Sequence, residues 1–331
     1  MRKSTWRFAA LISFGLPLCA PAQPSPPRTM STLEQAVSGA TPPPGSMAPQ
    51  SELDQALAAR DYERAAQLLA AAIERQPKSR ELLLQIASVF MMDRKPLNAA
   101  VALKKAEALG ALDNHARLQL ALAYIAMKRG DWARPELERL ALAEPANVTY
   151  LYWLARLDYD VSQYAVAIRR LQDVIARAPA FTRAHDNLGL CYEALNQTDE
   201  AIPHYREAVR LNRIDAAPTG WPALNLGILL RTRGELAEAE TLFREALTYD
   251  RHFAPGYYQL GALLEERGEM KEAVKALRQA TSSDTTYPEP HYALSRIYRR
   301  QGQVAEADEA LSTFERLRKQ RDQVARQEPV R

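Results

Sequence analysis

Apolar residues recur along most of the chain with spacings of three, four and seven residues, and the whole pattern repeats every 34 residues. These spacings place apolar side chains on one face of an α-helix. A glycine interrupts the clearest copies once, which predicts a helix, a tight turn and a second helix in each. A fixed period of this length is typical of a stacked helical solenoid. The period is marked by Leu226-Gly227, Leu260-Gly261 and Leu294-Ser295.

The 34-residue frame predicts an all-α fold of about eight repeats over residues 46–321. The repeats begin near residues 46, 80, 114, 148, 182, 220, 254 and 288. The third repeat is expected to be irregular. Its Gly130 and Trp132 fall two residues late, so we expect a short second helix with Pro135 in its first turn. Four extra residues, 216–219, should lengthen one turn and could divide the stack into two blocks.

One position in the first helix carries a small side chain in seven of the eight repeats, and one position in the second helix is likewise small. Small residues at a helix contact let the two backbones approach closely, and a bulkier residue would overpack the joint. A single repeat cannot bury its apolar face alone, so stability should come from contacts between neighbours. The small first-helix residues are Ala87, Ala121, Ala155, Gly189, Gly227, Gly261 and Ser295.

This set of positions resembles the tetratricopeptide repeat, abbreviated TPR. The resemblance implies a right-handed superhelical solenoid in which the first helices line a concave groove. It also implies that binding of a protein or peptide, and not catalysis, is the expected activity.

The first 22 residues are predicted to be a signal peptide. A basic region, a short apolar run and a small-x-small site follow one another, as secretory leaders require. We expect cleavage after about Ala22 and a periplasmic or secreted protein of the bacterial type. The apolar run is too short to span a membrane. Lipid attachment at Cys19 is poorly supported, because a lipobox needs a small residue where Leu18 stands. The basic residues are Arg2, Lys3 and Arg7, and the apolar run is 8–18.

Residues 23–49 are rich in proline, serine, threonine and glycine, which predicts a disordered linker. A recognition ligand is the alternative interpretation of such a segment. At the other end, basic residues are frequent, and we expect a capping helix that gives way to a disordered basic tail over 322–331.

Charge does not indicate a nucleic-acid partner. The chain has 43 Lys and Arg against 40 Asp and Glu. The leader supplies three of the positive charges and no acidic residue, so the mature chain would balance at 40 against 40. Cys191 would be the one cysteine left after cleavage, which leaves no intramolecular disulfide. No transmembrane segment is predicted beyond the leader.

Catalytic and metal-binding motifs are not recognised in the sequence. We find no glycine-rich phosphate loop, nucleophile elbow or paired-cysteine site. The histidines are scattered, and none has another at ligand spacing. We therefore expect no enzyme activity, no cofactor and no metal. The histidines are His115, His185, His204, His252 and His291.

Side-chain amides stand two residues before the small residue in five of seven first helices. An amide both donates and accepts hydrogen bonds, so a regular row of amides could hold an extended peptide backbone. The row resembles the asparagine ladder of the eukaryotic O-linked N-acetylglucosamine transferase, whose residue type only Asn187 and Asn225 match. Trp153 and Ala293 interrupt it. The amide row is Gln85, Gln119, Asn187, Asn225 and Gln259.

The other predicted groove positions change character along the chain. Apolar positions suit an amphipathic helix, whereas tyrosines beside arginines suit polar peptide or glycan contacts. Part of the apolar set could instead pack against residues 23–49 or a second copy, so a homo-oligomer stays open. The apolar and aromatic positions are Leu84, Met91, Leu118, Leu122, Tyr152, Tyr258 and Tyr292, and the charged positions are Arg296, Arg299 and Arg300.

The sequence therefore predicts a non-catalytic, exported scaffold that holds a protein or peptide partner in its groove. Two alternatives remain. One is binding of an envelope polysaccharide or other anionic polymer, which steep salt sensitivity would favour. The other is an accessory subunit of an enzyme complex.

Overall fold

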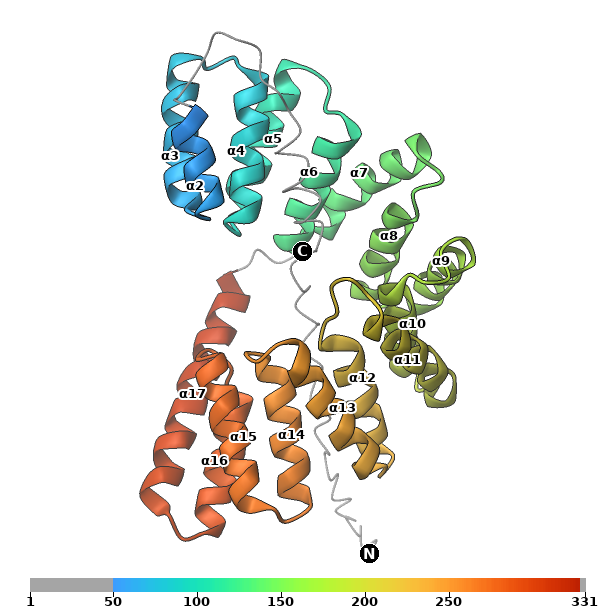
Figure 1. Cartoon of the computed structure of the whole chain (residues 1–331), viewed down its shortest axis with the longest axis vertical. Helices are drawn as coiled ribbons and strands as arrows, with labels where there is room; N and C mark the ends of the chain where they lie inside the picture. The colour runs from blue at the N-terminus through green and yellow to red at the C-terminus, as the bar shows by residue number, and fades with distance from the viewer. Residues whose placement is uncertain (1–49, 328–331) are drawn as a thin grey trace, which may run out of the picture. The chain divides into compact units, whose positions relative to one another are not determined.

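The structure is a computed structural model that describes residues 50–327, and these residues are helical with no strand. The signal peptide and linker predicted for 1–49, and the last residues of the predicted tail, 328–331, lie outside the described residues. The all-α prediction is confirmed (Figure 1).

The helices come in antiparallel pairs that correspond to the predicted repeats (Figure 1). The first helices of the pairs are α2 (Gln50–Ala58), α4 (Arg80–Met92), α6 (Asn114–Ala126), α8 (Val148–Asp160), α10 (Thr182–Ala194), α12 (Trp221–Thr232), α14 (Ala254–Glu266) and α16 (Glu289–Arg300). The second helices are α3 (Tyr62–Arg75), α5 (Pro96–Leu109), α7 (Gly130–Ala143), α9 (Tyr164–Arg177), α11 (Thr198–Arg213), α13 (Leu236–Tyr249), α15 (Met270–Ser283) and α17 (Val304–Gln327).

The described helices belong to two compact units, with the boundary between Pro145 and Ala146. We call residues 50–145, with α2–α7, the N-terminal unit and residues 146–327, with α8–α17, the C-terminal unit. The boundary does not fall at the insertion 216–219, where the sequence allowed one, because α11 and α12 pack together within the C-terminal unit.

Asn212 explains how the stack continues across the insertion. Its buried side chain donates a hydrogen bond to the carbonyl of Thr219 and accepts one from the amide of the same residue, both at 2.9 Å. This pair of bonds closes the inserted loop as a backbone pair would. The extra residues therefore lengthen a turn and leave the contact between the flanking repeats intact.

The small positions of the first helices act as predicted, because they admit large side chains from the second helix of the same repeat. A Cβ atom added at Gly189 would lie 2.6 Å from the Tyr205 ring, and one added at Gly227 would lie 2.6 Å from the Phe243 ring. Both rings are fully buried. Carbon atoms normally stay about 3.5–4.0 Å apart, so these two glycines are sterically required.

The turn inside each repeat contains one residue with positive φ. In the last three repeats this residue is glycine, at 234, 268 and 302. In the first five repeats it is another residue type at the same position, namely Arg60, Arg94, Lys128, Ser162 and Asn196. The helix–turn–helix geometry is thus conserved within the chain even where its usual glycine is missing.

The third repeat is regular, and the predicted irregularity was wrong. Lys128, with φ 58°, occupies the turn position, so Gly130 begins α7 and the helix has 14 residues like its neighbours. Pro135 lies inside α7 and not in its first turn. Pro203 occupies the equivalent position inside α11. Each proline removes a single backbone donor, and the helix continues past it.

The last helix is longer than the sequence indicated. α17 has 24 residues and continues to Gln327, although an unstructured tail was predicted from residue 322. No glycine or proline interrupts the sequence between Val304 and Gln327. Most of the residues there, such as alanine, glutamate, arginine and glutamine, favour helix, which accounts for the extension.

Candidate functional site

The first helices form the inner layer of each unit. In the N-terminal unit α4 contacts α6, and in the C-terminal unit α8, α10, α12, α14 and α16 contact one another in turn. Successive second helices make no comparable contact within the described part of the chain. A layer whose elements lie closer together is the inside of a curved stack, so the predicted groove positions are on the inner layer.

The predicted amide row joins neighbouring repeats. Gln119 is buried, and its Nε2 donates to Ser88 Oγ at 3.0 Å. Asn187 is also buried, and its Nδ2 lies 3.2 Å from the Tyr152 hydroxyl while its Oδ1 accepts from Arg156 Nη1 at 2.8 Å. Both amides bond residues of the preceding repeat, and this gives them a structural role.

Asn225 continues this pattern and meets a buried acid. Its Nδ2 lies 3.0 and 3.2 Å from the two carboxylate oxygens of Asp186. Burial raises the pKa of the Asp186 carboxyl to about 6, against the lowering effects of the Asn225 hydrogen bond and the Arg156 charge. Removal from water disfavours the ionised form of an acid, which explains the direction of the shift.

The remaining amides are less enclosed. Gln259 is half-buried and accepts a hydrogen bond from Arg231 Nη1 at 2.8 Å, while Gln85 is half-buried on α4. Contact of the amide row with a ligand stays a prediction. The structure adds that Gln119, Asn187 and Asn225 already use hydrogen-bonding groups within the chain.

Three of the apolar groove positions are partly exposed, and they belong to the N-terminal unit. Leu84 and Met91 on α4 and Leu118 on α6 are half-buried on the inner layer, whereas Leu122 is buried. Tyr152, on α8 of the C-terminal unit, is buried and packs against Phe181 with ring centroids 5.2 Å apart.

Aromatic side chains reach the surface in the last repeats of the C-terminal unit. Tyr292 on α16 is 45% exposed, and its ring lies 5.1 Å from that of Phe314 on α17. The guanidinium of Arg296 lies 5.5 Å from the centre of the Tyr292 ring. One repeat earlier, Tyr258 is half-buried and packs edge-on against Tyr287 at 5.5 Å.

The three predicted groove arginines are paired with acids. Arg296 and Arg300 both contact Glu265 on α14, at 2.6 and 3.4 Å, and Arg299 contacts Asp308 on α17 at 2.6 Å. Glu265 is buried, so its carboxylate draws the two guanidinium groups across the joint between repeats. The negative charges of two carboxylates thus partly neutralise the positive charges of the three arginines.

The comparisons with known proteins agree with this geometry. Two family models, both described as tetratricopeptide repeat, match residues 181–252 and 224–288. Tetratricopeptide repeats are thus recognised within residues 181–288. No curated protein matches it.

Solved structures of TPR proteins share the fold. One is the APC/C hetero-tetramer Cut9–Hcn1, with a TM-score of 0.60 and 14% identity over 74% of this chain and 48% of that one. Another is PilW, titled a widely conserved type IV pilus biogenesis factor, with a TM-score of 0.54 and 18% identity over 61% of this chain and 91% of that one. At these identities the likeness establishes the fold alone.

Sequence reasoning missed the charged partners of the amide row. Arg156, Asp186 and Arg231 were not among the predicted site residues, yet each bonds a member of the amide row. A signal was available for Arg231, which is the one charged residue in the otherwise apolar helix α12. Such a residue needs a partner inside the protein.

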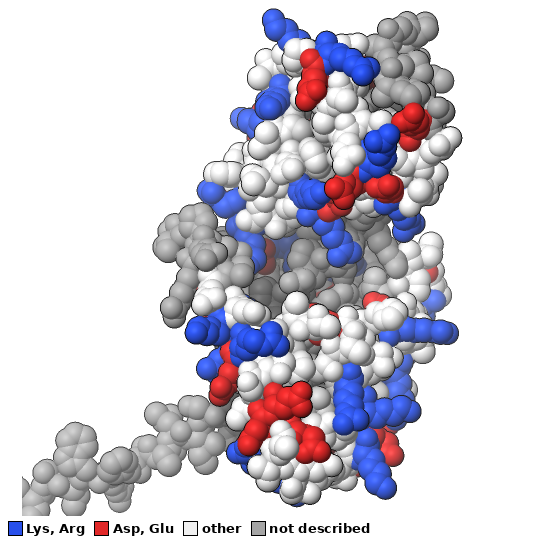
Figure 2. Space-filling model, turned by 90° about the vertical axis from the view of Figure 1, so that its left-hand side faces the viewer, with Lys and Arg blue, Asp and Glu red and all other residues white. Residues whose placement is uncertain are grey.

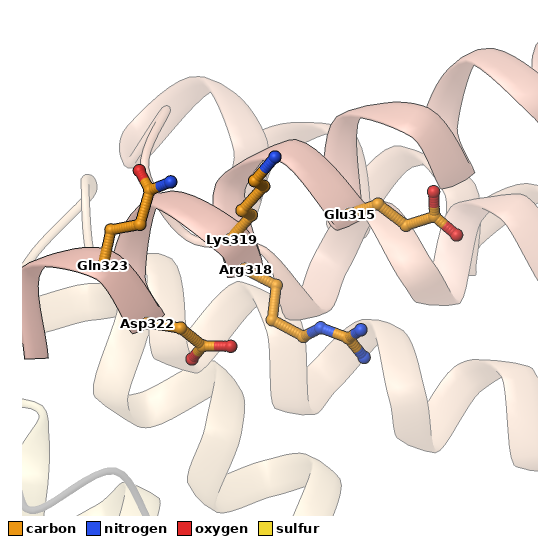
Figure 3. A pocket seen from close by; sticks show the side chains of 5 residues that line it. All are labelled: Glu315, Arg318, Lys319, Asp322 and Gln323. Atoms are coloured by element: carbon orange, nitrogen blue, oxygen red, sulfur yellow. The ribbon is translucent and has the colours of Figure 1, made fainter. Parts of the chain in front are cut away.

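A hollow on α17 is lined by five side chains that all come from that one helix (Figure 3). These are Glu315, Arg318, Lys319, Asp322 and Gln323. No second element frames the hollow, and it is therefore not a candidate active site.

Three further features bear on function. Residues 50–327 hold no group of acids, histidines and cysteines placed to bind a metal. None of the helices α2–α17 is long and apolar enough to cross a membrane. On the face shown in Figure 2, positive and negative side chains are interspersed.

Proposed function

We propose that the protein is a non-catalytic scaffold that binds a protein or peptide partner on the inner layer of its C-terminal unit. The observation that carries this proposal is the exposure of Tyr292 beside Arg296 on α16. Most apolar side chains of the repeats are buried between neighbouring helices, whereas the Tyr292 ring is accessible to solvent.

The chemistry of this surface suits a polypeptide. Tyrosine and arginine are enriched where proteins bind one another, because each combines a large contact area with directed polar groups. Tyr292 rests on Phe314, and Arg296 is held by Glu265. Side chains fixed before binding lose less conformational entropy when a partner arrives.

The anionic-polymer alternative is less well supported. Arg296 and Arg300 share Glu265, and Arg299 is paired with Asp308. A polymer that binds by charge would have to compete with these acids. Binding that weakens steeply with added salt would favour that alternative over the scaffold.

Export is the second part of the proposal. The leader ending near Ala22 supports a periplasmic or secreted location, and residues 23–49 would then link the mature N-terminus to the repeats. The intact mass of the protein recovered from the culture medium and envelope tests this part. A mature form that retains residues 1–22 contradicts it.

The binding surface can be tested by site-specific crosslinking in cells. A photoreactive residue replaces Tyr292, and the control replaces Lys275, an exposed residue on the second helix α15. We expect one or a few proteins to be captured at position 292 and not at 275. Tyr258→Ala should reduce that capture. Equal capture at both positions, or none at 292, contradicts the proposal.

A further inference from the structure

Three pairs of aromatic rings follow one edge of the inner layer in the C-terminal unit. Each pair joins a ring near the amino-terminal end of a first helix to a ring from the same repeat. The first helices α12, α14 and α16 are successive neighbours, so the pairs follow one another by one repeat (Figure 1). We call these three pairs the aromatic rim. They are Trp221–Phe253, Tyr258–Tyr287 and Tyr292–Phe314, with ring centroids 5.0, 5.5 and 5.1 Å apart.

The repeat fold does not require aromatic side chains at this edge. In early repeats the residue before a first helix caps that helix with its side chain, as Ser79 does for α4 and Asp113 for α6. Phe253 stands at the equivalent position before α14 and makes no such bond, although a side-chain cap normally stabilises a helix. In the N-terminal unit the residues equivalent to Tyr258 and Tyr292 are aliphatic, namely Leu84 and Leu118. The aromatic rim is therefore a local feature of the last three repeats.

Each pair of the aromatic rim carries a hydrogen-bond donor that is open to a ligand. Tyr292 is exposed, and Trp221 and Tyr258 are half-buried. Among the described residues, Trp221 Nε1, Tyr258 Oη and Tyr292 Oη have no hydrogen-bond partner, and none of these atoms is enclosed away from solvent. An aromatic ring with an open donor suits a ligand that brings both apolar surface and a carbonyl oxygen.

The two rings of a pair meet at an angle, so each pair forms a notch and not a flat face. The interplanar angles are 82°, 70° and 42° in chain order. The pyranose ring of a glycan needs a flat aromatic face to stack on. The compact ring of proline instead fits into an aromatic-lined groove. The shape of the aromatic rim therefore favours proline over a sugar.

The spacing of the repeats matches an extended proline-rich chain. Packed helices lie about 8–10 Å apart, so successive notches have about that separation. A polyproline II helix advances about 9.3 Å in each turn of three residues, and its backbone carbonyls make no internal hydrogen bonds. Every third residue of such a chain can therefore reach a notch while its carbonyls face the ring donors.

Charges beside the aromatic rim are balanced, which favours an uncharged ligand. The charges that act on Tyr258 come from two arginines and two glutamates, Arg231, Arg296, Glu265 and Glu289. Arg318 lies 5.4 Å from the centre of the Phe314 ring, with acids three residues before and four residues after it on α17. A proline-rich segment needs no counter-charge, because it binds through apolar contacts and main-chain hydrogen bonds.

We propose that the aromatic rim binds a proline-rich segment of the partner protein in the polyproline II conformation. This inference rests on the proposed function, and it names the kind of segment that the inner layer of the C-terminal unit would hold. Prolines spaced by three would occupy successive notches. The Trp221 indole and the hydroxyls of Tyr258 and Tyr292 would donate hydrogen bonds to the carbonyls between them.

The test uses residues 23–331 and fluorescein-labelled decaproline, which adopts the polyproline II conformation. A labelled glycine–serine peptide of the same length is the flexible control, and chitohexaose is the glycan control. Fluorescence anisotropy measures the affinity of the two peptides. The indole N–H signal of Trp221 in NMR reports whether a ligand binds at the aromatic rim.

The variants separate the ring from its polar group. Tyr258→Ala and Tyr292→Ala each remove a ring, whereas Tyr258→Phe removes only a hydroxyl. Tyr164→Ala is the matched control, because Tyr164 is a partly exposed tyrosine on the second helix α9. Circular dichroism checks that each variant is folded.

We expect decaproline to shift the Trp221 signal and to bind at least about tenfold more tightly than the flexible peptide, because its conformation is fixed in advance. Removal of either ring should weaken its binding about tenfold, and removal of the Tyr258 hydroxyl about threefold. Tyr164→Ala should leave the affinity unchanged.

The proposal is overturned by equal binding of the two peptides, or by unchanged affinity in both ring variants. A shift of the Trp221 signal with chitohexaose and not with decaproline would assign the aromatic rim to a glycan. A further variant replaces the six prolines between residues 24 and 44 by serine. If decaproline binds that variant and not the unaltered chain, the occupant is the chain's own segment and not a partner.

Crosslinking at position 292 distinguishes failure of this inference from failure of the proposed function. If the protein captured there is crosslinked through a segment without proline, this inference fails and the scaffold proposal stands. If position 292 captures no protein, the proposed function fails whatever the affinity for decaproline.

Discussion

Arg94 offers a direct test of the repeat geometry, because it adopts a conformation that suits glycine. Its φ is 55°, in the left-handed region, at the position where later repeats have Gly234, Gly268 and Gly302. A residue with a Cβ atom loses about 1–2 kcal/mol in this conformation. Glycine avoids that loss but gives the unfolded chain extra freedom worth roughly 0.5–1 kcal/mol. Arg94→Gly should therefore stabilise the chain by about 0.5–1 kcal/mol.

The measurement is urea denaturation followed by circular dichroism, with hydrogen exchange of α4 and α5 to localise the change. Gly268→Ala is the reverse experiment. Nothing lies within 4 Å of the added methyl group, so a loss of about 1 kcal/mol would report the backbone alone. Gln67→Gly, in the exposed face of α3, is the control and should destabilise by about 1 kcal/mol. If Arg94→Gly destabilises as much as Gln67→Gly does, the reasoning is refuted.

Three further predictions follow from burial. Gly227→Ala should destabilise the chain by about 1–3 kcal/mol, because the added methyl group overlaps the enclosed Phe243 ring. The protection of α12 and α13 in hydrogen exchange should fall. Unchanged protection would contradict the close packing of the two helices. The raised pKa of Asp186, about 6, means that its ionisation opposes folding, so the penalty is absent below about pH 4 and complete above about pH 6. Asp186→Asn should thus gain up to about 3 kcal/mol relative to the unaltered chain at pH 7.5 but only about 1 kcal/mol at pH 4.5. Comparing the two proteins at each pH cancels the effect of His204, whose pKa is lowered by burial and whose contribution has the opposite sign. Cys191 is buried, and burial raises the pKa of its thiol to about 12. A thiol reagent at pH 8 should therefore label Cys191 only after the chain unfolds. Rapid labelling of the folded chain would show that the helices around Cys191 open.

The sequence by itself determined the repeat architecture. The 34-residue period, the helical phase of the apolar residues and the small first-helix positions are local signals. They reappear in the structure as successive helix pairs, two of which pack closely through Gly189 and Gly227. The same signals failed in the third repeat. There the position of Gly130 predicts a late turn, whereas the turn residue in the structure is Lys128, with φ 58°.

Only the tertiary structure decided what the polar and exposed residues do. Asn187 and Asn225 looked like a row of ligand contacts, but their bonds to Arg156 and Asp186 span neighbouring repeats. Leu97 and Val101 of α5 are exposed in the structure, although the sequence alone could not separate them from the buried apolar residues of the same helix. Helical periodicity depends on residues three or four positions apart, so it can be recognised in the sequence. The partner of a polar group depends on atoms some thirty residues away, and only folding brings those atoms together.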